Sequence, residues 1–97
     1  MAEVWQLKRA GDDEALEKAL LDLVQMTETE SRASGWGVAS AWYEELAILY
    51  QRHKDYRAEV AVLGRFANQR HAPGVKPPQL LERLDKARAL LAESQRG

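Results

Sequence analysis

The chain has 97 residues, of which 30% are charged and 45% hydrophobic, with a net charge of −1 and no cysteine. A chain of this length is expected to form one domain and to bury roughly 60–65% of its unfolded surface, enough for a core without metal or crosslinks. The lack of cysteine excludes disulfides, thiolate zinc sites and cysteine nucleophiles. No run approaches the roughly 18 apolar residues of a membrane span and the N-terminus lacks a signal-peptide pattern, so we expect a cytoplasmic protein without a membrane partner.

The small net charge hides an asymmetry between the two halves of the chain. Residues 1–50 carry four basic and ten acidic side chains, a net charge of −6, whereas residues 51–97 carry ten basic and five acidic ones, a net charge of +5. This pattern permits self-association between unlike halves, or binding of an acidic partner by the basic half. A chance imbalance within one helical domain is the alternative.

The first third of the chain predicts two helices. Residues 2–10 are long enough for about two helical turns. After Gly11, the acidic residues that begin at Asp12 suit a helix N-terminus, because they accept hydrogen bonds from free amides and lie at the positive end of the helix dipole. Apolar residues then recur at spacings of three and four, namely Leu16, Ala19, Leu20, Leu23 and Val24. This pattern predicts an amphipathic helix over 13–31, whose polar end, TETESRAS, frays into a loop.

Three more helices are predicted downstream. Ser40 is expected to cap a helix over 41–53, and Asp55 to cap one over 56–70. The segment HAPGVKPP ends the fourth helix, and Pro78 at a first helical position starts a fifth over 78–94. No segment alternates convincingly with period two, so the predicted class is all-α. We expect one domain over 1–97, made of a helix pair in 1–34, a second pair in 40–70 and the capping helix 78–94.

An internal repeat relates the two predicted pairs. Shifting the chain by 43 residues places Asp12 on Asp55 and Leu20 on Leu63. In both copies a helix ends, a turn capped by aspartate follows and a second helix begins, so each copy is predicted to be a helix–turn–helix pair.

Residues 43–67 resemble a tetratricopeptide repeat. The leading helix has the aromatic, leucine, small and tyrosine positions of that signature, namely Tyr43, Leu46, Ala47 and Tyr50. The turn Lys54-Asp55-Tyr56 is similar to the family's frequent Gly-Asp-Tyr, and Leu63 and Phe66 match two later apolar positions. The chain departs from the family pattern at Glu59, where a small residue is usual, and at Pro73, where the closing proline is displaced.

The resemblance implies a tetratricopeptide-like fragment of an α-α superhelix, with about five helices in antiparallel pairs. It also implies a non-enzymatic module that binds another protein or peptide, or a second copy of itself. In that family the leading helix of each pair lines the concave surface. Carried onto this chain, the lining residues are Ala41, Glu44, Ile48, Gln51 and Arg52.

Two further residues are candidates for special roles. Glu59 is predicted either to be a buried structural carboxylate, paired with Arg52 or with an indole or phenol of the preceding helix, or to lie at the edge in water; if buried, it needs a partner. Trp36, in the loop Gly35-Trp36-Gly37, either anchors a partner or folds back onto the core, which is the favoured interpretation. Core packing is also predicted for Trp5 and Trp42.

The sequence shows no pattern typical of catalysis or of a bound cofactor. His53 and His71, the only histidines, lack metal-ligand spacing, and no phosphate-binding loop or nucleophile motif occurs. We therefore expect no enzymatic activity, metal or cofactor. An alternative function is an accessory segment of a nucleic-acid-handling complex, as on some larger bacterial proteins with similar helical tails. It would contact phosphates through basic residues of 51–97, namely Arg52, Lys54, Arg57, Arg65, Arg70 and Lys76.

Overall fold

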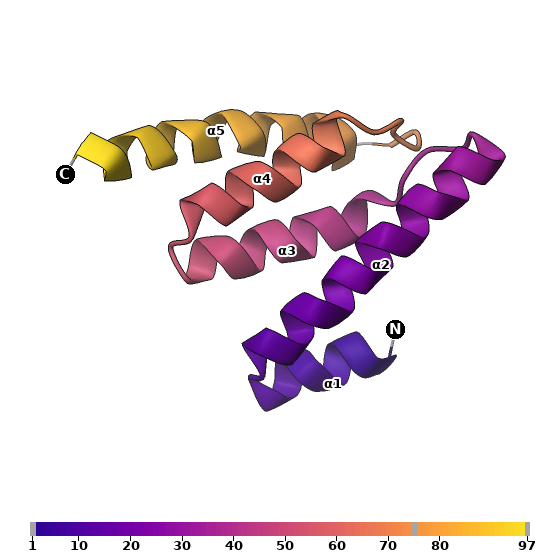
Figure 1. Cartoon of the computed structure of the whole chain (residues 1–97), viewed down its shortest axis with the longest axis horizontal. Coiled ribbons are helices and arrows are strands. Elements are labelled where there is room, and N and C mark those ends of the chain that lie inside the picture. The colour runs from indigo at the N-terminus through magenta and orange to yellow at the C-terminus, as the bar shows by residue number, and fades with distance from the viewer. Residues whose placement is uncertain (1, 75, 97) are drawn as a thin grey trace.

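The computed structural model describes residues 2–74 and 76–96, and it confirms the all-α class (Figure 1). The helices are α1 (Ala2–Ala10), α2 (Asp13–Ser34), α3 (Ser40–Arg52), α4 (Tyr56–Ala67) and α5 (Lys76–Arg96). Within the described residues no β-strand forms, and the only strand-like feature is an isolated bridge between Val38 and His71. The five predicted helices are therefore present in their predicted order.

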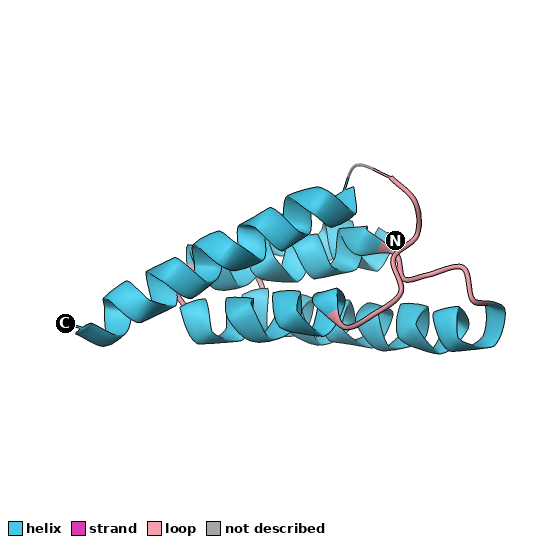
Figure 2. Cartoon of the chain, turned by 90° about the horizontal axis from the view of Figure 1, so that it is seen from above, coloured by secondary structure: helices cyan, strands magenta, loops and turns pink. Residues whose placement is uncertain are grey.

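Each helix packs against the next one along the chain, and α5 also returns to touch α3. Figure 1 shows α3, α4 and α5 stacked side by side, with α2 running diagonally away from them and α1 lying along its lower end. Seen from above, the helices form two layers, and α5 crosses them obliquely (Figure 2). The molecule is a flattened body of 44 × 30 × 19 Å.

The α1–α2 and α3–α4 turns have the same geometry, as the internal repeat predicts. Gly11 and Lys54 occupy the left-handed region, with φ of 71° and 56°. The residues that follow them, Asp12 and Asp55, each accept a hydrogen bond at Oδ1 from the amide three residues later, at 3.1 Å in both cases. The equivalence of the two turns is therefore structural as well as sequential.

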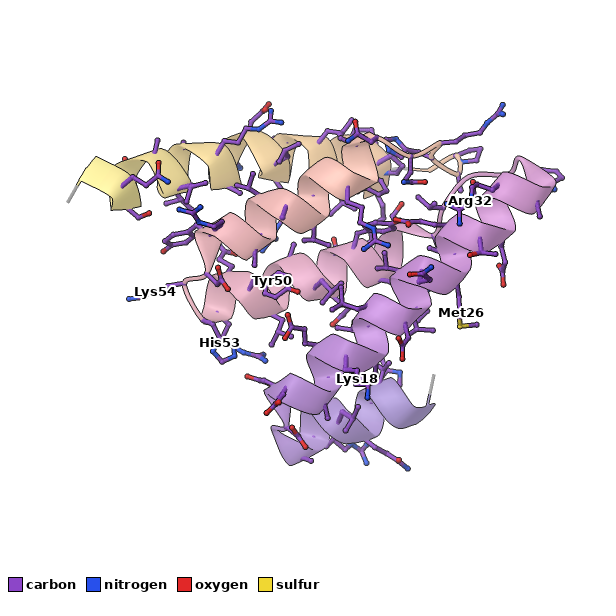
Figure 3. All side chains as sticks on the ribbon, viewed as in Figure 1. Lys18, Met26, Arg32, Tyr50, His53 and Lys54 are labelled. Carbon is purple, nitrogen blue, oxygen red and sulfur yellow. The ribbon has the colours of Figure 1, made fainter. Side chains whose placement is uncertain are left out.

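Lys54→Gly is expected to raise the free energy of unfolding by about 0.5–1 kcal/mol, because only glycine adopts a positive φ without steric cost. Lys54 projects from the α3–α4 turn (Figure 3), so the substitution removes no packed side chain. Urea denaturation measures the change. Lys54→Ala is the control, since it removes the same charge but keeps a Cβ at the same φ. An equal gain from both variants would show that the backbone conformation is not the cause.

The core is formed by the apolar stripes of all five helices. Its largest fully buried side chains include Tyr43, Phe66, Leu20 and Leu63. The rings of Tyr43 and Phe66 lie 5.1 Å apart, and the imidazole of His71 stacks on Phe66 at 4.0 Å. These contacts attach the segment after α4 to the α3–α4 hairpin.

The predicted core roles of the tryptophans are only partly correct. Trp42 is half-buried and packs against the core, as predicted. Trp5 is 61% exposed and Trp36 is 78% exposed, so the predictions of core packing for Trp5 and of a loop tryptophan folded back onto the core are wrong. Both residues lie on segments that have too few neighbours to cover an indole.

The polar end of α2 is ordered rather than frayed. The helix continues to Ser34, and its stripe of buried positions runs on through Thr27, Glu28 and Ser31. The Thr27 hydroxyl accepts a 2.8 Å hydrogen bond from the amide of Ala39, which fixes the following loop. The predicted fraying is wrong because Thr27 and Glu28 make tertiary hydrogen bonds that the local sequence does not reveal.

The α2–α3 loop is locked against the α4–α5 loop. The amide of Val38 donates a 2.8 Å hydrogen bond to the carbonyl of Arg70. Gly37 lies so close to this segment that a Cβ would be 2.4 Å from the amide nitrogen of Ala72. Two loops that are distant in sequence therefore hold α2 and α5 around the central hairpin.

Several predicted helix boundaries differ from the structure. Ser40 is the first residue of α3 rather than its cap, and Ala39 at the cap position makes no side-chain hydrogen bond. The fourth helix ends at Ala67 rather than at 70, because the chain turns there to join the α2–α3 loop. The fifth begins at Lys76 rather than at Pro78, since prolines are tolerated throughout a first helical turn, where amides lack helical partners.

Candidate binding face of α1, α3 and α5

The residues predicted to line a binding surface form one stripe along α3, with Ile48 at its centre. Ile48 is 41% exposed and is the large apolar side chain that this stripe presents to solvent. Glu44 and Gln51 lie toward α5, where they contact Lys76 and Arg83 respectively. Ala41 and Arg52 lie toward α1 and α2.

Arg52 does not contribute a free charge to this stripe. Its Nη2 lies 2.8 Å from Oδ1 of Asp13, at the start of α2, and His53 Nε2 lies 2.6 Å from the other oxygen of the same carboxylate. Asp13 therefore holds the end of α3 to the start of α2. The remaining four residues, Ala41, Glu44, Ile48 and Gln51, are called the α3 face below.

A hollow borders the α3 face on the side of α1. It has a volume of about 170 Å³ and is lined by Val4, Trp5, Lys8, Ala41, Trp42 and Glu45. An ion pair of 2.9 Å between Lys8 and Glu45 closes one rim, and the Lys8 ammonium lies 4.9 Å from the centre of the Trp5 ring. The hollow is thus lined by two indoles and two aliphatic side chains, with a charged edge. Sequence reasoning missed Trp5 as a surface residue.

A larger groove borders the α3 face on the side of α5. This α3–α5 groove has a volume of about 310 Å³. Its lining combines charged, amide and aliphatic side chains, namely Glu44, Gln51, Glu59, Gln79, Leu80, Glu82, Arg83, Lys86, Ala87 and Leu90. Glu44 lines the groove and Glu45 lines the hollow beside α1. Ile48 follows these two residues by one helical turn, so it lies on the ridge between the two cavities.

Glu59 lies at the base of the α3–α5 groove and is only 1% exposed. Its Oε2 accepts a 3.1 Å hydrogen bond from Nε of Arg83, and Arg83 in turn donates from Nη2 to Gln51. Of the two alternatives predicted for Glu59, the structure shows the buried one, but the predicted partner, Arg52 or an aromatic of the preceding helix, is wrong. The partner, Arg83, lies on α5 rather than on α3, the helix that precedes α4.

The second oxygen of Glu59 is unsatisfied. Oε1 is buried and has no hydrogen-bond partner among the described residues. Burial raises the pKa of Glu59, and the nearby Arg83 guanidinium opposes this shift without cancelling it. A buried acceptor without a donor is rare in folded proteins and costs free energy, so this atom is the most unusual polar group of the face.

A second buried carboxylate, Glu28, joins three helices away from this face. It accepts a 2.7 Å hydrogen bond from the hydroxyl of Tyr43 and two from Arg65, at 2.7 and 2.8 Å. Burial acts to raise the pKa of Glu28, but the hydrogen bonds from Arg65 and Tyr43 outweigh it and lower the pKa overall. Sequence reasoning missed Glu28, although it continues the buried stripe of α2 in register.

The basic residues proposed to contact phosphates are divided between two roles. Arg52, Arg65 and Lys76 pair with Asp13, Glu28 and Glu44 respectively. In the described part of the chain, no carboxylate pairs with the exposed residues Lys54, Arg57 and Arg70. Each of the three pairs joins an acid of the first half to a base of the second, so part of the charge asymmetry serves contacts within the molecule.

No protein-family model, curated protein or solved structure matches this chain. Among the residues that the structure describes, no helix is both long enough and apolar enough to cross a membrane. The same residues contain no group of three or more histidine, cysteine or carboxylate side chains arranged to hold a metal ion.

Proposed function

We propose that this chain is a non-enzymatic, tetratricopeptide-like module that binds another protein through the face of α1, α3 and α5. The observation that carries the proposal is the exposed Ile48, flanked by the aromatic hollow on one side and by the α3–α5 groove on the other. Exposed apolar side chains beside shaped hollows are typical of protein-binding sites.

The shared geometry of the two helical turns supports the tetratricopeptide-like interpretation. Gly11 and Lys54 have matching left-handed φ values, and Asp12 and Asp55 cap the following helices in the same way. Alternate helices then border one surface, because α1 and α5 flank α3 across the two hollows. A surface lined by every second helix is the arrangement that stacked helix pairs use to bind partners.

The charged groups of the face favour recognition over catalysis. Glu44, Glu59 and Glu82 are held by Lys76, Arg83 and Lys86 respectively. A catalytic group needs a nucleophile and a base within reach of each other and of a substrate. These acids and bases neutralise each other in pairs. Such paired charges suit an interface, where they fix the alignment of a bound partner through polar contacts.

Ile48→Glu tests the proposed function. The variant places a charge at the centre of the face, so we expect it to weaken retention of a co-purifying protein by roughly tenfold or more, as for a central interface residue. Met26→Glu is the matched control, because Met26 is a 56% exposed apolar residue on α2. Affinity capture from cells, quantified by mass spectrometry, compares the variants, and sedimentation equilibrium over a dilution series detects self-association. A wild-type monomer that captures no more protein than Ile48→Glu would refute the proposal.

The nucleic-acid alternative now depends on Lys54, Arg57 and Arg70, the basic residues without a carboxylate partner in the described part of the chain. Non-specific binding to phosphates is strongest at low salt. A gel-shift titration over a salt series tests it, and a lack of retardation at the lowest salt concentration would remove this alternative.

A further inference from the structure

The α3–α5 groove contains a buried acceptor that lacks a donor. Glu59 is 1% exposed, and its Oε2 is occupied by Arg83. Its Oε1 has no hydrogen-bond partner within the described residues, although the side chain lines the groove. A single donor group inside the groove would complete the hydrogen bonding of this carboxylate.

The geometry of the Glu59 carboxylate defines the kind of donor. Because Arg83 already holds Oε2, only one oxygen is available, and the planar fork of a guanidinium needs two. An ammonium is a point charge that binds a single oxygen. The acids of the lining, Glu44, Glu59 and Glu82, pair with Lys76, Arg83 and Lys86. Among the described residues, Oε1 of Glu59 is therefore the buried acceptor that these pairs leave without a donor.

The aliphatic part of the groove fits the stem that carries such an ammonium. Leu80, Ala87 and Leu90 lie along α5 among the polar lining residues. The four methylenes of a lysine pack on apolar surface while the charged end reaches a polar group. The volume of about 310 Å³ is that of a small binding pocket and exceeds what one side chain occupies.

We propose that the α3–α5 groove binds a lysine side chain of a partner protein, with its ammonium on Oε1 of Glu59 and its stem along Leu80 and Leu90. The ammonium enters as the exposed side chain of Lys86 moves aside, while Arg83 stays on Oε2 of Glu59. This inference rests on the proposed function and specifies the chemistry of the partner: a lysine-bearing segment that crosses the ridge at Ile48.

A capped lysine, Nα-acetyl-lysine N-methylamide, is the probe for this site. Titrated into ¹⁵N-labelled protein, it is expected to shift the backbone amide signals around Glu59 and along the first half of α5, with a dissociation constant in the millimolar range. The Nε-acetylated form of the probe has the same stem without the charge, and we expect it to bind at least roughly tenfold more weakly. A capped arginine serves as a second comparison. We expect it to bind more weakly than capped lysine, because a guanidinium binds a carboxylate best through two oxygens and Glu59 has only one free.

Glu59→Gln keeps the size of the side chain and removes its charge, and should weaken the lysine probe by roughly tenfold. Glu93→Gln, an exposed site on α5 outside the groove, is the charge-matched control and should leave binding unchanged. If Glu59→Gln does not fold, the contrast between the lysine probe and its acetylated form in the wild-type protein decides the question.

Three outcomes would overturn the inference. The first is that the probe causes no shift at the groove, and the second is that the acetylated probe binds equally well. The third is that butylammonium binds as tightly as capped lysine, which would indicate that the ligand of the groove is a small free amine rather than a lysine of a protein. Its failure is separable from that of the proposed function. Partner capture that depends on Ile48 without lysine binding refutes only the groove assignment. Lysine binding without any captured partner refutes only the proposed module.

Discussion

Replacing Arg83 with methionine is expected to lower the free energy of unfolding by about 3 kcal/mol at pH 7, because it leaves the Glu59 carboxylate buried without a counter-charge. Glu59 is 1% exposed, and Arg83 is the only hydrogen-bond partner of its carboxylate in the described residues. Methionine keeps the unbranched stem, so the packing against α4 is retained while the charge is lost. Urea denaturation at constant pH measures the effect.

Arg88→Met is the control for this prediction. Arg88 lies on the same helix, and its pair with Asp85 is exposed and 4.0 Å long, so we expect a change within about 0.5 kcal/mol. The double variant Glu59→Leu with Arg83→Met should return to within about 1 kcal/mol of the wild type, since apolar residues often replace a buried ion pair without loss. Leu16, the buried leucine at the equivalent position of the first hairpin, shows that this register accepts it. A double variant as unstable as Arg83→Met would contradict this explanation.

The loss caused by Arg83→Met should depend on pH in a defined direction. Burial raises the pKa of Glu59 above its ordinary value of 4.5, and removing Arg83 takes away the group that opposes this shift. A carboxyl whose folded pKa exceeds its unfolded pKa loses stability as the pH rises from the unfolded toward the folded value. The difference between variant and wild type should therefore be largest at neutral pH and shrink as the pH falls toward 4.5. A constant difference over that range would show that Glu59 does not cause the loss.

Glu28→Ala is the second substitution with a large expected effect, a loss of about 2–3 kcal/mol in the free energy of unfolding. It removes the acceptor shared by Tyr43 on α3 and Arg65 on α4, and leaves the buried Tyr43 hydroxyl without its partner. The loss is set below that of Arg83→Met because the side chain of Arg65 is 39% exposed and can be rehydrated. Chemical denaturation monitored by tryptophan fluorescence measures it.

Glu30→Ala is the matched control, because Glu30 is an exposed glutamate on the same helix whose side chain makes no hydrogen bond in the described structure. The pKa of Glu28 is lowered in the folded state, since its hydrogen bonds outweigh the effect of burial. Its contribution is therefore present above its unfolded pKa near 4.5 and is lost as the pH falls below that value. Equal losses from Glu28→Ala and Glu30→Ala would show that the three-helix junction contributes little.

The sequence was sufficient to predict the local structure of this protein. Apolar stripes identified four of the five helices, because a helix must bury one stripe whatever it packs against, and the length of the segment before Gly11 predicted α1. The turns at Asp12 and Asp55 were also predictable, since a side chain that caps an amide three residues later acts within one helical turn. The surface position of Ile48 followed from the register of the best-matching helix.

The tertiary structure alone decided which polar groups are paired and which aromatics are exposed. Glu59 meets Arg83 across 24 residues, and Glu28 meets Arg65 across 37, so neither pair leaves a trace in local spacing. Trp5 and Trp36 are of a residue type that usually packs in a core, but no neighbouring element covers them. Helical periodicity is a property of one segment. The partner of a buried charge and the exposure of an indole depend on how the segments pack, and the long α5 determined both the burial of Glu59 and the groove above it.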